Sequence, residues 1–384
     1  METNVRKERL SFVADLASGH WSMTELCERY GITRPTGYKW QARFEAGGRA
    51  GLRDASRAPE ACPHRTPEAQ VALILAARLE YGWGAKKLLG VLQTRHPSQT
   101  WPTRSTLNAI LERHHLLRKN RRRRKWAHPG AAPLITQRPN QVWPADFKGQ
   151  FRTGDGYYGY PLTITDHFSR SVLTCHGLHS VTTRDAKPVF RSLCRAVGLP
   201  DAIRTDNGTP FASTGIHGLA ALNVWWMQLG IVHQRITPAS PQENGTHERM
   251  HRELKRETAR PAAASLRAQQ RRFDAFRQRY NDDRPHEGID NATPSSRWSP
   301  SPRPFPERHT PPDYPAHMEV RRVSTAGTFR FVTRRQPFLS HALSGQDIGL
   351  EEVEDGIWNI VYYQTLLGKL DERTARITGI VGRT

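Results

Sequence analysis

The sequence has few residues of several kinds, and each shortage excludes a class of protein. Only 4 of its 384 residues are cysteine, and they are scattered without paired spacing. This argues against a disulfide framework and against a cysteine-rich zinc site. No window approaches the ~20 apolar residues of a membrane-spanning helix, and the N-terminus lacks the apolar core of a signal peptide. We therefore expect a protein of the reducing cytoplasm with no membrane partner.

Acidic residues are also scarce relative to basic ones. Lysine and arginine total 57 and aspartate and glutamate total 36, which leaves a formal charge of +21. A protein with this excess commonly binds a polyanion, and nucleic acid is the commonest one. A ribosome-like structural protein or a generically basic surface is the alternative. The apolar fraction of 37% is low but sufficient for several small cores, so the length predicts two to four domains.

Residues 1–60 show the pattern of a helix-turn-helix DNA-binding domain. A capping box at Ser22 and Glu25 opens a short helix, and Gly31 begins the turn that follows it. The third helix has Pro35 in its first turn and is basic. An ordinary helical hairpin is the alternative, but the charge of the chain favours DNA binding. The candidate contacts on this helix are Arg34, Lys39 and Arg43.

Residues 61–118 repeat this arrangement of three helices, and the entry to the third is again polar and basic. We interpret them as a second helix-turn-helix-like domain with Arg104 as a candidate DNA contact. A basic linker follows over residues 119–137, and such a run repels itself and stays extended unless it meets phosphate. Its position next to the helical domains favours contact with a DNA backbone over mere solvation. The arginines proposed for this contact are Arg121, Arg122, Arg123 and Arg124.

From residue 138 the pattern changes to apolar, β-branched runs that alternate with helices. This predicts a mixed α/β domain over residues 138–283. Two acidic side chains here lie at the ends of apolar runs. Asp146 lies within such a run, where an acid is costly unless it is paired or bound to a cation. Asp206 directly follows a predicted strand, and the ends of strands are where sites in α/β sheets usually form.

A third acid, Glu248, lies near the start of a polar helix. His251, Arg252 and Lys255 follow it at offsets of 3, 4 and 7 residues, which puts all four side chains on one face. Oxygen-only ligands suit a hard cation such as Mg²⁺. Two such ions held close together can stabilise the attacking and the leaving oxygen of a phosphodiester displacement. The three acids therefore predict a metal-dependent site for phosphoryl transfer.

Five motifs of this region share a specific order and context, namely WPADFKG, TDHFSR, RTDNGTPF, ITPASPQENGTHERMHRELK and YNDDRPHEGIDNATP. Together they resemble the catalytic core of the DDE transposase and retroviral-type integrase superfamily, and most closely that of bacterial insertion-sequence transposases. The resemblance covers about residues 138–300. It implies an RNase H-like fold with a mixed five-stranded sheet, and two Mg²⁺ or Mn²⁺ ions per active site. It also implies that the catalytic residues and metal ligands are Asp146, Asp206 and Glu248.

The resemblance extends to residues beyond the three acids. Lys255 matches the basic residue that contacts the element's DNA end in the family, and Arg252 is a second candidate contact. The separation of the last two acids, 248 − 206 = 42 residues, is longer than is usual for relatives of this type. We place the extra residues in the loop 213–222. Glu243 could be mistaken for the third acid, but only Glu248 falls at the family's position after Asn-Gly.

A transposase is the function that this resemblance implies. It would bind the terminal inverted repeats of a mobile element, cleave the 3′ ends and transfer them to target DNA. The expected partners are double-stranded DNA at the element ends and at the target, and further copies of the chain that bridge two ends. A partner ATPase, which some relatives use for target choice, is not visible in the sequence. We interpret residues 284–316 as a Pro-rich linker and residues 317–384 as a small β-barrel.

Two other functions are alternatives. HERMH, at residues 247–251, matches the H-E-x-x-H motif of zinc metalloproteases, with Glu248 as general base and two histidine ligands. Short motifs of this kind arise by chance, and the turn before it predicts solvated histidines at a helix start. A DNA-binding regulator without catalysis, such as a repressor of its own element, is the other alternative. The presence of all three acids weighs against it.

Overall fold

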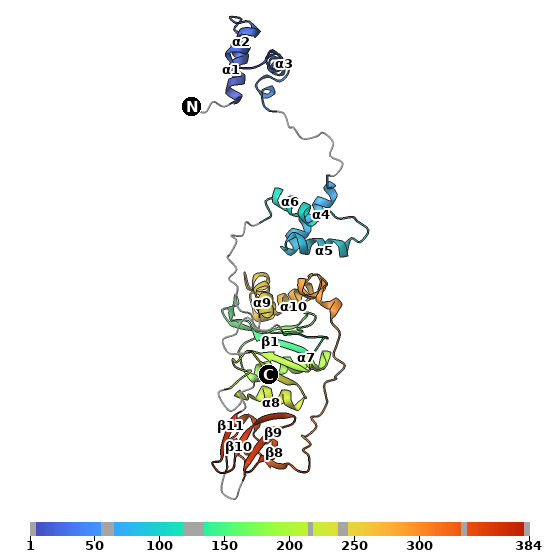
Figure 1. Cartoon of the computed structure of the whole chain (residues 1–384), viewed down its shortest axis with the longest axis vertical. Coiled ribbons are helices and arrows are strands. Elements are labelled where there is room, and N and C mark those ends of the chain that lie inside the picture. The colour runs from blue at the N-terminus through green and yellow to red at the C-terminus, as the bar shows by residue number, and fades with distance from the viewer. Residues whose placement is uncertain are drawn as a thin grey trace. The chain divides into compact units, whose positions relative to one another are not determined.

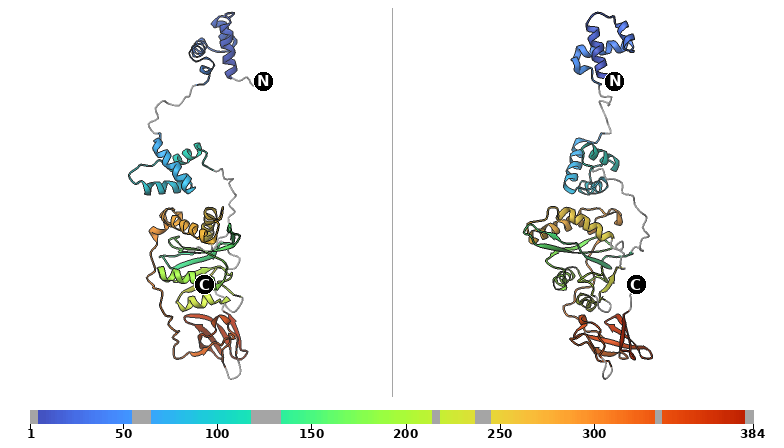
Figure 2. Two further views of the ribbon diagram at one scale, coloured as in Figure 1. Left: turned by 180° about the vertical axis from the view of Figure 1, so that it is seen from behind. Right: turned by 90° about the vertical axis from the view of Figure 1, so that its left-hand side faces the viewer.

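The computed structural model describes residues 5–54, 65–117, 134–213, 218–236, 245–331 and 336–379. The chain divides into two compact units, Met1–Pro67 and Glu68–Thr384. Figure 1 labels the helices and strands, and Figure 2 shows the same ribbon from two further directions. Among the described residues, no helix is both long and apolar enough to cross a membrane.

The first unit contains three helices, α1 (Val5–Ala17), α2 (Met23–Arg29) and α3 (Arg34–Gly51). The predicted capping box is present, because the hydroxyl of Ser22 accepts a hydrogen bond from the backbone of Glu25 and the carboxylate of Glu25 accepts one in return. α3 packs closely on α2, since a Cβ atom added at Gly37 would lie 2.8 Å from the sulfur of Cys27. The short helix, the turn and the third helix therefore form as the sequence predicts.

The second unit begins with three more helices, α4 (Glu68–Tyr81), α5 (Ala85–Arg95) and α6 (Arg104–Arg113). Each contributes apolar side chains at helical spacing to one small core, including the fully buried Ile74, Leu88, Leu107 and Ile110. Thr103 caps α6 by accepting a hydrogen bond from the backbone of Thr106. The polar residues before this third helix therefore include its N-cap, as the sequence pattern indicates.

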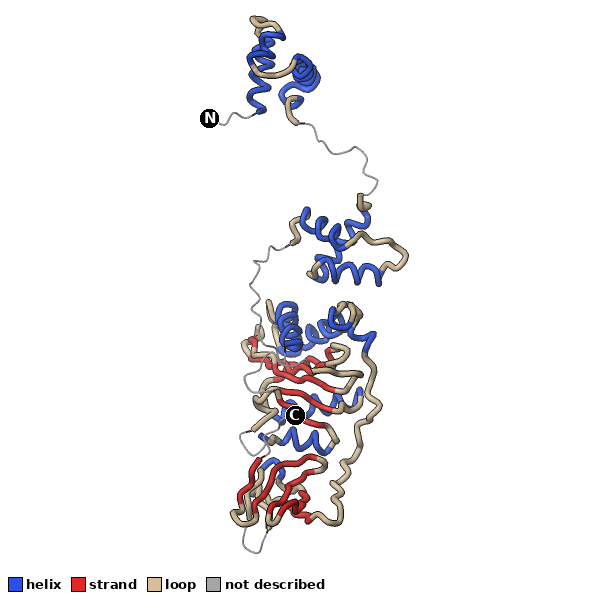
Figure 3. Tube along the Cα trace, viewed as in Figure 1, coloured by secondary structure: helices blue, strands red, loops and turns tan. Residues whose placement is uncertain are grey.

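A mixed sheet forms the centre of the second unit (Figure 3). Its strands are β1 (Val142–Phe147), β2 (Phe151–Arg152), β3 (Tyr158–Thr165), β4 (Val172–Leu178), β5 (Ala202–Thr205) and β6 (Val232–Arg235). β1 pairs with β3 in antiparallel and with β5 in parallel orientation, and β6 extends the parallel part. The sheet has six strands rather than the expected five. The extra strand arises because residues 148–150 are not in strand conformation, so that β1 and β2 pair with β3 as two separate strands.

Helices cover both faces of this sheet, as Figures 1 and 2 show. On one face, α7 (Thr183–Val197) and α8 (Ala221–Gln228) pack against strand residues such as Trp143 and Ile203. On the other, α9 (Gly245–Thr258) and α10 (Leu266–Asp282) pack against Val172 and Cys175. Successive strand residues point to opposite faces, so Asp146 lies on the opposite face from the buried Trp143 and Ala145. The acid therefore faces α9.

An apolar stripe anchors α10, because Phe273, Phe276 and Tyr280 are all buried against the sheet. The chain then continues past α10 with two short 3₁₀ helices, Glu287–Ile289 and Pro294–Arg297. Beyond them, Trp298 and Phe305 pack against the core of the central sheet. The Pro-rich segment therefore contributes apolar contacts to the domain of the central sheet.

The C-terminal strands form an open sheet, and the predicted β-barrel is not confirmed. They are β7 (Glu319–Arg322), β8 (Asp347–Glu354), β9 (Ile357–Tyr362), β10 (Thr365–Asp371) and β11 (Arg376–Gly379), and among the described residues the edge strands β7 and β11 do not pair. The apolar cluster of this sheet also contains side chains from α8 and from the residues just before it, namely Leu219, Val224 and Met227. Because another element covers its apolar face, the sheet needs no closure to bury it. β8 and β9 form a hairpin that turns at Gly356.

Candidate active site

Strand pairing brings the first two predicted acids to the same level of the sheet. β1 and β5 are parallel neighbours, and Pro144 of β1 lies opposite Arg204 of β5. Two residues further along each strand come Asp146 and Asp206, so the same register places the two acids side by side. The turn after β5 fixes the second of them, because the backbone N–H of Gly208 donates to Oδ1 of Asp206 at 3.1 Å.

Glu248 joins these acids from the first turn of α9. The electrostatics of Asp146 show the proximity of all three. Burial, together with the negative charges of Asp206 and, more weakly, Glu248, raises the pKa of Asp146 to about 7. Asp206 is partly buried and Glu248 is exposed. The carboxylates of Asp206 and Glu248 therefore both lie near enough to Asp146 to act on its pKa, while a backbone hydrogen bond from Phe147 and the charge of Lys148 act in the opposite direction.

A groove of about 660 Å³ opens at this point of the surface, and Asp146 and Glu248 line it. The predicted DNA contacts Arg252 and Lys255 line the same groove. Sequence reasoning missed three further cationic side chains there, Lys148, Arg256 and Arg260. Because acidic and basic side chains line this groove together, it can bind a phosphodiester backbone through the basic groups and hold metal ions against it through the acids.

Two threonine–histidine networks hold the backbone at the two aspartates. The hydroxyl of Thr163 donates to the backbone carbonyl of Asp146 at 3.0 Å, and it lies 2.6 Å from Nε2 of His251 and 2.7 Å from Nε2 of His247. The other network repeats this pattern on β5. The hydroxyl of Thr205 donates to the carbonyl of Asp206 at 2.9 Å, and Nε2 of His233 lies 2.9 Å from that hydroxyl.

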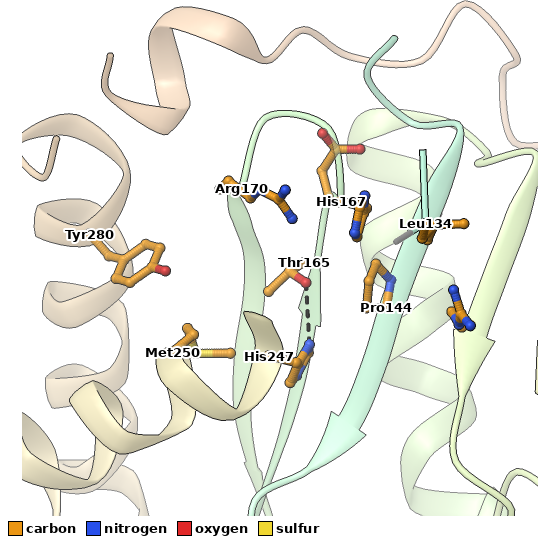
Figure 4. A pocket seen from close by; sticks show the side chains of 10 residues that line it. Leu134, Pro144, Thr165, His167, Arg170, His247, Met250 and Tyr280 are labelled. Atoms are coloured by element: carbon orange, nitrogen blue, oxygen red, sulfur yellow. Dashed lines mark hydrogen bonds between the residues drawn. The ribbon is translucent and has the colours of Figure 1, made fainter. Parts of the chain in front are cut away.

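His247 and His251 are buried, each with 3% of its surface exposed, so the prediction that they are solvated is wrong. Burial lowers the pKa of His247 to about 3 and that of His251 to about 2, which keeps both imidazoles neutral. The apolar face of α9 packs against the sheet, and both histidines belong to that face. Figure 4 shows His247 bonded to Thr165 beside a small cavity. This cavity, of about 30 Å³, has room for water but not for a substrate.

Comparison with known proteins is consistent with this geometry. Two profiles described as integrase core domain match residues 136–241 and 229–294. A 39.2 kDa protein of insertion element IS476 from Xanthomonas euvesicatoria is 30% identical over 258 residues, covering 64% of this chain and 69% of that protein. The chain belongs to the integrase-core family of insertion-element proteins. Members of this family act in DNA transposition and integration.

Other relatives of the integrase core were found in both sequence and structure. A 31.7 kDa protein of insertion element IS407 from Burkholderia multivorans is 29% identical, covering 45% of this chain and 58% of that protein. A simian T-cell lymphotropic virus intasome subunit is 20% identical with a TM-score of 0.38, covering 76% of this chain and 97% of the other. The HTLV-2 integrase core, solved with magnesium, is 17% identical with a TM-score of 0.33, covering 42% and 97%. The family assignment rests on the sequence matches.

The helical domains of this integrase-core protein also match known families. A helix-turn-helix profile matches residues 8–60, and a homeodomain-like profile matches residues 36–111. The candidate contacts Arg34, Lys39 and Arg104 are exposed, at or near the starts of α3 and α6. Arg43 is partly buried, with its guanidinium 5.2 Å from the centre of the Trp40 ring. The candidate contacts of the basic linker, Arg121–Arg124, lie outside the described residues.

The metalloprotease alternative is not favoured by the geometry around α9. A zinc site of the H-E-x-x-H type needs a free nitrogen on each histidine. Both nitrogens of His247 already have partners, Thr163 and Thr165, at 2.7 and 3.3 Å. The motif therefore fits an integrase core in which Glu248 faces the groove and the histidines pack beneath it.

The three carboxylates fit the divalent cations that the family implies. Asp146, Asp206 and Glu248 offer oxygen ligands only, which suits Mg²⁺ or Mn²⁺. Burial is the largest cause of the raised pKa of Asp146, and the negative charges of Asp206 and Glu248 add to it, so a cation bound there would be stabilised by these charges. The donor set and the local charge therefore both accommodate the ions.

Buried histidines should make the integrase core sensitive to acid. Burial lowers the pKa of His233 to about 3, whereas the unfolded chain binds this proton near pH 6.5. The unfolded state therefore binds more protons between these values, and the free energy of unfolding falls as the pH falls through this window. We expect a loss of at most ~1.4 kcal/mol per pH unit from this histidine.

Unfolding of the whole chain by denaturant at pH 7, 6 and 5 measures this effect. His233→Gln should flatten the dependence of stability on pH, whereas replacement of the exposed His179 by Gln should leave it unchanged. An equal slope for His233→Gln and the unaltered protein would show that His233 does not take part.

Proposed function

We propose that this protein binds the terminal inverted repeats of its own mobile element, cleaves the 3′ ends and joins them to target DNA. Asp146, Asp206 and Glu248 are the catalytic residues and metal ligands of this proposal. The observation that supports it is geometric: the parallel register of β1 and β5 carries Asp146 and Asp206 to neighbouring positions, and Asp146 and Glu248 line one groove. Two Mg²⁺ or Mn²⁺ ions would be held by these carboxylates.

The bound cations would activate the attacking oxygen and neutralise charge on the leaving oxygen. In the first step, water attacks the phosphodiester at the element end, the P–O bond to the terminal 3′ oxygen breaks, and that oxygen takes a proton. In the second, the new 3′-OH attacks a phosphodiester of the target strand, whose own 3′ oxygen leaves. Each step exchanges one P–O bond for another, so no serine or tyrosine nucleophile is needed.

The protein's own residues position the DNA for these displacements. Lys148, Arg252 and Lys255 line the groove with the acids and would bind phosphates on either side of the reacting one. Thr163 and Thr205 fix the backbone carbonyls of the two aspartates, which sets the direction of both carboxylates. Catalysis would then rest on orientation and on charge stabilisation in a prearranged site.

Recognition of the ends is assigned to the helical domains, with Arg34, Lys39, Arg43 and Arg104 as candidate contacts. A helix in the major groove can read base edges, whereas contacts to phosphates carry affinity without sequence information. Because two element ends must be joined together, a multimer that bridges them is expected. Inverted repeats on both sides of the gene would supply the natural DNA substrate. A regulator without catalysis is the alternative, and loss of all chemistry from the intact chain would favour it.

Removal of residues 1–60 should abolish discrimination between the true element end and scrambled DNA. The reason is that the first helix-turn-helix domain reads bases, while the groove of the core contacts backbone. Competition binding on the two duplexes at one fixed salt concentration measures the ratio of affinities. The matched variant Arg34→Ala/Lys39→Ala, in the full-length chain, should lower the ratio in the same direction. A truncated chain that keeps the full ratio would contradict this assignment.

A further inference from the structure

His251 has one ring nitrogen without a hydrogen, and the hydrogen bonds of Thr163 establish which one. The hydroxyl of Thr163 has a single hydrogen, which it donates to the backbone carbonyl of Asp146. It must therefore accept from the two imidazoles, Nε2 of His251 at 2.6 Å and Nε2 of His247 at 2.7 Å. Each neutral imidazole thus carries its hydrogen on Nε2, and each Nδ1 offers a lone pair.

The two Nδ1 atoms differ in what they face. Nδ1 of His247 lies 3.3 Å from the hydroxyl of Thr165, which can donate to it. Nδ1 of His251 lies 3.7 Å from Oδ2 of Asp146. A neutral imidazole lone pair and a carboxylate oxygen are both acceptors, so this contact becomes favourable only with a proton or a metal cation between the two atoms.

We propose that Nδ1 of His251 is a nitrogen ligand, beside Asp146, for one cation of the candidate active site. This inference rests on the proposed function and adds a ligand to its three carboxylates. Ligand atoms around an ion with bonds of ~2.0–2.1 Å lie about 3.0–3.4 Å apart, so a shift of a few tenths of an ångström brings the two atoms into range. Histidine ligands donate their other N–H to a fixed acceptor, and Thr163 is that acceptor here.

The chemical consequence is a preference among cations. Imidazole nitrogen suits Mn²⁺, Co²⁺ and Zn²⁺, whereas Mg²⁺ prefers oxygen. One cation position of this protein would therefore be mixed, with nitrogen from α9 and oxygen from β1. Asp146, His247 and His251 each place a ligand atom within 4.8 Å of the others. Since both nitrogens of His247 are engaged, His251 is the ligand of the two.

Pulsed electron paramagnetic resonance of Mn²⁺ bound to the full-length, DNA-free protein tests this directly, because it detects a nitrogen bonded to the ion. The unaltered protein and His247→Gln should both show this coupling. His251→Ala should lose it and bind Mn²⁺ about tenfold more weakly or worse, with less than about a threefold change for Mg²⁺. His251→Gln can place an amide N–H near the position of Nε2 and so keep a donor to Thr163. It should lose the coupling while remaining folded by circular dichroism.

Undiminished coupling in His251→Ala and His251→Gln would overturn the proposal, and so would its loss in His247→Gln alone. Asp146→Asn separates this result from the proposed function. If Asp146→Asn loses Mn²⁺ and Mg²⁺ binding while His251→Ala keeps the nitrogen coupling, only the histidine ligand is wrong. If Asp146→Asn binds both cations as tightly as the unaltered protein, the carboxylate site itself is wrong.

Discussion

Single replacement of Asp146 or Asp206 by asparagine should lower the rate of DNA end cleavage at least about a thousandfold, which corresponds to ~4 kcal/mol of transition-state stabilisation. The amide keeps the size of the side chain but removes the charge that holds a cation. Cleavage of a labelled terminal-repeat duplex under single-turnover conditions measures the rate. Asp274→Asn alters an exposed acid on α10 and should cleave normally.

Affinity for the same duplex should survive both replacements or increase. Asp146 and Asp206 repel each other in the free protein, and phosphate adds further negative charge at the groove. Removal of one carboxylate therefore favours DNA while it abolishes chemistry. Equal loss of binding and cleavage would show that the variants are misfolded or that these acids support the fold. Undiminished cleavage in either variant would remove that aspartate from the site.

Removal of divalent cations should abolish cleavage completely and reversibly. EDTA should stop the reaction, and Mg²⁺ or Mn²⁺ in excess should restore it, because the carboxylates alone cannot offset the charge that develops on the phosphate. A chelator selective for zinc should have no effect. The cations should also raise the melting temperature of the DNA-free protein, since they relieve the repulsion around Asp146.

The stabilisation by cations provides an internal control for the chelation experiment. Asp206→Asn should lose most of the rise in melting temperature, whereas Asp274→Asn should keep it. Cleavage that continues in EDTA, or that is restored only by zinc, would contradict a site built from three carboxylates. Protease activity restored by zinc would instead favour the H-E-x-x-H motif as the functional one.

Much of the fold could be predicted because local patterns and tertiary packing agree. The helix α2 begins where its capping box predicts, and β5 ends just before Asp206, as expected. The burial stripe of α10 follows from the spacing of Phe273 and Tyr280. A helix or strand can be located from the sequence alone when its own residues contain the capping motif, the hydrophobic spacing or the turn that defines it.

The rest depends on contacts between segments that are distant in the sequence. Burial of His247 and His251 requires knowing which face of α9 meets the sheet, and the polar composition of this helix conceals that face. Thr163 becomes important only because β3 pairs with β1, which sets it opposite Asp146. The C-terminal strands alternate apolar and polar residues, as the strands of a barrel do. Their apolar face is instead covered by residues in α8 and just before it.

The most direct test of the three-carboxylate site compares Glu248→Gln with Glu243→Gln in one assay. Full-length protein, Mg²⁺ and DNA with the element's terminal repeat are incubated with a target duplex, and freed 3′ ends and joined strands are counted. Glu248 lies in the first turn of α9 and lines the groove with Asp146, whereas Glu243 lies outside the described residues. Glu248→Gln should yield neither product while Glu243→Gln yields both at the normal rate. Full activity in Glu248→Gln, with Glu243→Gln inactive, would contradict the site.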